Sequence, residues 1–154
     1  MGNLNQNIPA DVAGNWGTDL QYNGSTFETV RANFEQTVLS SATRSATVTS
    51  ADLTNFNFAG AVFFLNVTSV PGSGSAMVSL VIQGKDPVSG NYVNLFTGGS
   101  ASTGTVTVMY HPGISASANG VAGILPRTFR VLGAVSAGAT SKDVVFSVGM
   151  SFVK

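Results

Sequence analysis

The side chains that could support catalysis in this 154-residue sequence are few and far apart. The single histidine, His111, comes just before Pro112 and could act as a general base or as a metal ligand. Both roles need a second group nearby, but the nearest acidic residues along the chain are Asp86 and Asp143. We therefore interpret His111 as an ordinary residue at the end of a strand.

The acidic residues are equally dispersed. No two of them lie at the spacing of an acid–base pair or an Asp-x-Asp calcium loop; they are Asp11, Asp19, Glu28, Glu35, Asp52, Asp86 and Asp143. No serine lies in Gly-x-Ser-x-Gly, and no glycine-rich segment leads into the Gly-Lys-Ser/Thr of a phosphate-binding loop. The absence of cysteine excludes thiol catalysis and cysteine-ligated zinc. The sequence predicts a protein that is not an enzyme and needs no cofactor or metal.

Two charged segments indicate structural roles. Asp86 precedes Pro87 in a segment that ends at Gly90, which predicts a hairpin turn capped by the Asp86 side chain. Arg127 and Arg130 differ by an odd number of positions, so an alternating strand places them on opposite faces. One of them should face outward, and we expect structural ion pairing there.

The charge content of the chain is low. Charged residues make up 9% of it, and seven basic residues balance seven acidic ones; roughly 25% is typical of soluble proteins. The surface must therefore be covered by uncharged polar residues or by partner subunits. Without clustered lysine and arginine, nucleic acid is excluded as the main partner. The longest apolar run, at residues 59–65, is too short to span a bilayer and no signal-peptide pattern is present. We expect a soluble protein with no membrane partner.

Short β-type runs separated by turn residues fill residues 41–154. Period-2 alternation and turn signals predict strands at residues 45–49, 61–68, 76–83, 92–96, 103–110, 126–133 and 144–153. Residues 51–58 and 112–125 are predicted to be loops. The pattern is typical of an all-β fold, an antiparallel β-sandwich of the jelly-roll or immunoglobulin-like kind. These two strand orders stay open at this point.

Residues 1–40 have a different texture, rich in Asn, Gln and Gly. Proline and glycine in this segment disfavour a long helix, so we predict an extended N-terminal arm with a helical turn or two at residues 26–35. Its large apolar residues are candidate anchors on a partner surface: Leu4, Ile8, Trp16, Leu20, Tyr22 and Phe27. The arm has two alternatives, since it can lie on a neighbouring subunit or fold back on its own domain.

Two motifs carry a resemblance to a known family. Gln-Gly-Lys-Asp-Pro-Val-Ser-Gly at residues 83–90 and Leu-Pro-Arg-Thr-Phe-Arg-Val at residues 125–131 resemble segments of a family of small virion proteins of tailed bacteriophages. The resemblance extends over residues 43–154 and leaves the first 40 residues uncovered. It implies a structural component of the virion, made in the host cytoplasm.

The leading hypothesis is a capsid decoration or cement protein on the capsid surface. Its partners would be the major capsid protein and copies of itself, in a homo-oligomer for which a trimer is one option. The alternative is a tail or head-fibre module that binds host surface glycans through aromatic residues such as Tyr92, Tyr110 or Phe129.

Overall fold

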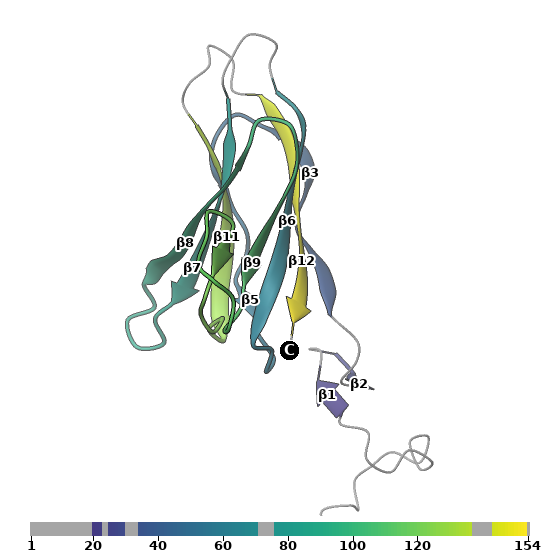
Figure 1. Cartoon of the computed structure of the whole chain (residues 1–154), viewed down its shortest axis with the longest axis vertical. Helices are drawn as coiled ribbons and strands as arrows, with labels where there is room; N and C mark the ends of the chain where they lie inside the picture. Colours follow the sequence, from purple (N-terminus) through teal and green to yellow (C-terminus); the bar gives the residue numbers. More distant parts are fainter. Residues whose placement is uncertain (1–19, 23–24, 30–33, 71–75, 137–142, 154) are drawn as a thin grey trace, which may run out of the picture. The chain divides into compact units, whose positions relative to one another are not determined.

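The computed structural model describes residues 20–22, 25–29, 34–70, 76–136 and 143–153 (Figure 1). Every regular element among these residues is a β-strand, which confirms the all-β prediction. In the described part of the chain, no helix is long and apolar enough to cross a membrane. The chain divides into two compact units, residues 1–32 and 33–154.

Two five-stranded sheets form the larger unit. The first, which we call the β3 sheet, has the order β10-β9-β6-β12-β3, from β3 (Glu35–Arg44), β6 (Gly60–Ser69), β9 (Gly104–Tyr110), β10 (Gly120–Val121) and β12 (Val144–Val153). The second, the β8 sheet, has the order β4-β11-β7-β8 with β5 also paired to β11, from β4 (Val48–Thr49), β5 (Leu53–Thr54), β7 (Val78–Lys85), β8 (Tyr92–Ala101) and β11 (Thr128–Val135). All pairings are antiparallel except the short β9–β10 contact. Figure 1 shows the two sheets facing each other.

The strand order resolves the choice that the sequence left open. Strand β3 pairs with β12, β4 with β11, β6 with β9 and β7 with β8. Along the chain these pairs are nested, so that each pair lies in the sequence between the two strands of the pair before it. This nesting is the double Greek key of a jelly roll. An immunoglobulin-like sandwich would instead have the orders A-B-E-D and C-F-G.

Alternating strands supply the core between the two sheets. In β12, every second residue from Val144 to Phe152 is buried, while the interleaved residues are partly exposed apart from the buried Ser151. The ring of Phe129 in β11 meets Phe63 of β6 and Phe152 of β12 edge to face, at centroid distances of 6.4 and 6.1 Å. Each such side chain contributes about 1.5–3 kcal/mol through burial. The core therefore joins both sheets, and the β-sandwich prediction is confirmed.

Strand β3 was not predicted from the sequence, whose first predicted strand, residues 45–49, overlaps β4. Residues 33–40 were assigned to the arm, but β3 starts at Glu35, pairs with β12 and belongs to the sandwich. Phe34 just before it stacks on Phe152 at 5.9 Å. Two register shifts in the β3–β12 ladder break the alternation of β3, because a bulge places consecutive residues out of phase. The sequence pattern of this strand was hidden for that reason.

The smaller unit contains a two-stranded antiparallel hairpin of β1 (Leu20–Tyr22) and β2 (Phe27–Thr29). The helical turns predicted at residues 26–35 are therefore wrong where the structure describes the chain, because residues 27–29 and 35 are in strands. Three candidate arm anchors, Leu20, Tyr22 and Phe27, lie in this hairpin, and Tyr22 is opposite Phe27. The other three, Leu4, Ile8 and Trp16, lie outside the described residues.

Candidate functional site

The outer face of the β3 sheet is almost free of charge. Strands β6, β9 and β12 contain no charged residue, and β3 has charged residues only at its two ends, Glu35 and Arg44. Phe64 and Met109 are 41% and 46% exposed on neighbouring strands. They lie among exposed threonines of β9, with Thr107 opposite Phe64 in the ladder. The part of this face formed by β6, β9 and β12 can be covered by a partner without removing a charge from water.

The guanidinium of Arg44 is not free on this face, because it forms hydrogen bonds with the irregular part of the β3–β12 ladder. It donates hydrogen bonds to the carbonyl oxygens of Phe146 (2.5 Å) and Ser40 (2.6 Å). Its Cζ lies 4.4 Å from the centroid of the Phe146 ring. Burial lowers the pKa of Arg44. The side chain thus donates to carbonyl groups beside the register shift of the ladder.

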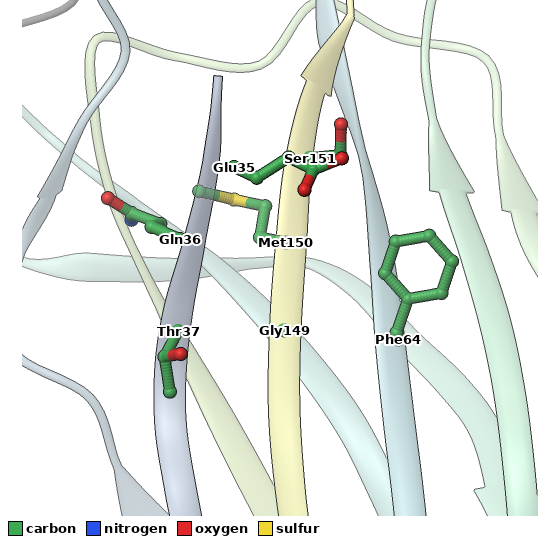
Figure 2. Close-up of a pocket in the computed structure, with 7 residues that line it drawn as sticks. All are labelled: Glu35, Gln36, Thr37, Phe64, Gly149, Met150 and Ser151. Atoms are coloured by element: carbon green, nitrogen blue, oxygen red, sulfur yellow. The ribbon is translucent and has the colours of Figure 1, made fainter. Parts of the chain in front are cut away.

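A hollow of about 400 Å³ lies on the same face. Figure 2 shows Phe64 of β6 on one side of it and Gln36 and Thr37 of β3 on the other, with Gly149 of β12 between them. A Cβ atom on Gly149 would meet nothing within 4 Å. The missing side chain at Gly149 therefore leaves an open depression on this face, and the exposed Glu35 is the charged residue in its lining.

Charge gathers instead at one corner of the β8 sheet. The described residues of the larger unit include eight charged side chains, and five of them surround the start of β11 and the β7–β8 turn: Asp52, Lys85, Asp86, Arg127 and Arg130. We call this set the charged corner. In a chain with so few charges, such a concentration marks a candidate polar binding site.

Most of the charged corner is internally paired. The Lys85 ammonium lies 2.8 Å from Asp52 Oδ2, and the Tyr92 hydroxyl donates to Asp52 Oδ1. Hydrogen bonds from Lys85 and then Tyr92 lower the pKa of Asp52, and the bond with Asp52 raises the pKa of Lys85. Arg130 Cζ lies 3.5 Å from the Tyr92 ring centroid, and its Nε donates to Gln83 Oε1 at 2.7 Å. Arg130 thus stacks on a ring and bonds a neutral amide instead of forming the expected ion pair.

The β7–β8 turn has the structure that the sequence predicted. Asp86 accepts hydrogen bonds from the Val88 amide (2.9 Å) and the Ser89 hydroxyl (2.5 Å), and Gly90 has a φ of 74°. The Ser89 hydroxyl and then the Val88 amide lower the pKa of Asp86. The negative charge of Asp86 is therefore stabilised within its own turn.

A groove of about 590 Å³ runs along the charged corner. The turn residues Asp86, Pro87 and Gly90 form one wall, and the segment from Pro126 to Thr128 forms another. Asp52, Thr54 and Lys85 complete the lining. Among the contacts described for the larger unit, the exposed side chain of Arg127 has neither a hydrogen bond nor an ion pair.

Asn55 fixes the position of this groove. Its side chain is 7% exposed, and Nδ2 donates to the carbonyl oxygens of Phe58 (2.9 Å) and Leu125 (2.8 Å). Its Oδ1 accepts from the Phe58 amide at 2.9 Å, and its backbone amide donates to the Arg127 carbonyl oxygen at 2.7 Å. Sequence reasoning did not single out Asn55, because a lone asparagine in a loop gives no sign of burial.

The residues that had been considered for chemistry have ordinary positions. His111 follows β9, as expected, and its amide donates to the Val121 carbonyl oxygen at 3.1 Å. Tyr110 and Phe129 are only 6% and 0% exposed, so neither presents a ring to a ligand. Burial raises the pKa of the Tyr110 hydroxyl. Among the described residues, no group of three acidic, histidine or cysteine side chains could hold a metal ion.

Comparison with known proteins adds no relative to this picture. No protein-family model, curated protein or solved structure matches the chain.

Proposed function

We propose that the chain is a non-enzymatic structural protein of the virion of a tailed bacteriophage, a decoration protein on the capsid surface. It stabilises the head through contacts with the major capsid protein and with copies of itself, for which a trimer is one option. The observation that carries the proposal is the uncharged outer face of the β3 sheet, with the exposed Phe64 and Met109 at its centre.

The physical argument concerns the cost of covering a surface. A charged side chain buried without a partner loses several kcal/mol of hydration, whereas apolar surface gains about 25 cal/mol per Å² on burial. The threonines around Phe64 can exchange hydrogen bonds with water for hydrogen bonds with a partner at little net cost. A face of this composition suits lasting contact with another protein.

Two further observations support the proposal. The jelly roll is the domain architecture of many viral capsid proteins, although lectins and cupins share it, so the fold alone does not decide a function. The resemblance of residues 43–154 to small virion proteins points to the same class of particle. The first 32 residues form a separate unit, and we propose that their apolar residues provide a second contact with neighbouring subunits.

The glycan-binding alternative has less support. Of the three aromatic residues that it would use, Tyr110 and Phe129 are buried in the core. The third, Tyr92, has Arg130 stacked on its ring and donates its hydroxyl hydrogen to Asp52. None of the three presents a fully exposed ring to a sugar, and no other observation favours this function.

A pair of matched variants tests the proposal. Thr107 in β9 and Thr97 in β8 are both exposed strand threonines, one on the outer face of each sheet. Purified Thr107→Asp should attach to heads lacking this protein at least about tenfold more weakly than wild type, because the carboxylate would be buried unpaired. Thr97→Asp should attach as wild type does. Equal attachment of all three proteins would rule out the β3 sheet as the contact surface.

A truncation tests the contribution of the N-terminal unit. The deletion should end at residue 32, because a longer one would remove Phe34 and strand β3 from the sandwich. The truncated protein should keep its unfolding temperature but attach to heads more weakly. Unchanged attachment would show that residues 1–32 do not contribute, and localisation to tail tips by labelled antibody would favour the glycan-binding alternative.

A further inference from the structure

We propose that the groove of the charged corner binds a carboxylate side chain from an acidic segment of a protein partner, with Arg127 as the recognition residue. This site lies on the β8 sheet, and head attachment is assigned to the β3 sheet. The inference therefore goes beyond the proposed function and does not depend on it.

The balance of charge in the groove carries the argument. The Asp52 carboxylate is compensated by Lys85 and Tyr92, and the Asp86 carboxylate by its own turn. Among the described groove residues, Arg127 is the charged side chain with neither a hydrogen bond nor an ion pair. Arg130, just beside the groove, stacks on the Tyr92 ring, donates to a neutral amide and interacts electrostatically with Asp52. With Arg130 included, three cationic side chains face two carboxylates at this corner, which favours an anion.

The walls of the groove are rigid before any ligand binds. Pro87 begins one wall and Pro126 the other, and proline fixes its own φ near −65°. Pro126 packs so closely on β7 that a Cβ on Gly84 would lie 3.1 Å from its Cγ. The Arg127 carbonyl oxygen is held by the Asn55 amide. Preorganisation of this kind lowers the entropy lost on binding.

The chemistry of the lining selects the ligand. A guanidinium presents a planar pair of N–H donors that matches a carboxylate in a bidentate contact. The threonines Thr54 and Thr128 line the same groove and offer hydroxyl groups to the backbone of a bound segment. Pockets for small organic ligands are usually rich in aromatic residues, but none of the described lining residues is aromatic. These features favour an acidic peptide segment over an acidic sugar.

The test is an NMR titration of the full-length protein labelled with ¹⁵N, in which the arginine Nε–Hε signals are followed. The probe is N-acetyl-glutamate N-methylamide, and its glutamine counterpart is the neutral control. We expect the Arg127 signal to shift and saturate with the glutamate compound only. In Arg127→Gln, the affinity reported by neighbouring amide signals should fall about tenfold, the value of one charged hydrogen bond.

Several outcomes decide the matter. Arg127→Lys keeps the charge and should retain part of the affinity, whereas Asp143→Asn, just before the start of β12 in the β3 sheet, should leave it unchanged. Equal shifts with the two compounds, or full affinity in Arg127→Gln, would overturn the proposal. Stronger binding of galacturonate than of the glutamate compound would assign the groove to an acidic sugar and overturn the peptide proposal. None of these results bears on the attachment of Thr107 variants to heads.

Discussion

The two sheets have the same number of strands, but their outer faces differ in where charged residues lie. The β3 sheet presents threonine, serine, Phe64 and Met109 over three strands that contain no charged residue. Five of the eight charged side chains described in the larger unit lie at one corner of the β8 sheet, Lys85 and Arg130 in its strands and the other three in the adjoining loops. Among these residues, charge is therefore concentrated at one corner and not spread evenly.

The demands of folding do not explain this difference. Both sheets contribute the same kind of inner face, and their phenylalanines meet in one core through the Phe63–Phe129 contact. Charge on an outer face costs little in water, so the β3 sheet could carry it without loss of stability. We infer that the difference reflects what each face contacts: a broad partner surface on one side, and a single polar group on the other.

The largest loss of unfolding free energy is expected for a substitution of Asn55, which holds the charged corner in place. Asn55→Ala removes three side-chain hydrogen bonds and leaves buried backbone groups unpaired, at a cost of about 3 kcal/mol. Chemical denaturation should show this loss. The control is Asn57→Gly, because Asn57 is exposed and has a φ of 70° that glycine adopts freely.

Asn55→Ala should also change the amide NMR signals of one face and not those of the other. The amide signals of the groove walls should shift, because the Asn55 amide and side chain bond the Leu125–Arg127 segment. The signals of Thr105 and Thr107 on the other sheet should not. Shifts of equal size on both faces would mean that Asn55 supports the whole sandwich and not the corner alone.

The sequence predicted much of the fold but little of the charged corner. The sequence predicted strands β6, β7, β9, β11 and β12 within a few residues, and it predicted the start of β8 but not its second half, whereas bulges hid β3. The Asp86 turn was predictable because all its hydrogen bonds are local. The contacts of Asp52 with Lys85 and Tyr92 were not, since they join residues 33 and 40 positions apart. Only the register of four strands brings those side chains together.

A smaller difference in unfolding free energy is expected between alanine substitutions at two glycines, one in each region. Gly90 has a φ of 74°, whereas Gly149 on the uncharged face has no such restriction and has open space at its Cβ position. Gly90→Ala should lower the free energy of unfolding by about 1 kcal/mol, the cost of a left-handed residue with a side chain. Gly149→Ala should be neutral or slightly stabilising. Thermal unfolding of both variants would measure the contrast, and equal losses would contradict it.

The smallest effect is the acid sensitivity of the charged corner. The pKa of Asp52 in the folded protein lies below its ordinary 3.8 because Lys85 and then Tyr92 donate to the carboxylate. A lowered pKa stabilises the folded state above pH 3.8, and this stabilisation disappears as the pH falls through the folded pKa. At the other end, the raised pKa of Lys85 gives stability that is lost as the pH rises through it, above 10.5.

Wild type should therefore exceed Asp52→Asn in unfolding free energy by a small, constant amount between about pH 5 and pH 9, and the two curves should converge in acid. Asp86, whose pKa is also lowered, titrates in both proteins and cancels from the difference. Denaturation at matched ionic strength would measure it, since salt screens an exposed pair. A difference that persisted at pH 2 would mean that Asp52 acts through its hydrogen bonds as a neutral group. The charged corner would then be a polar network rather than an electrostatic one.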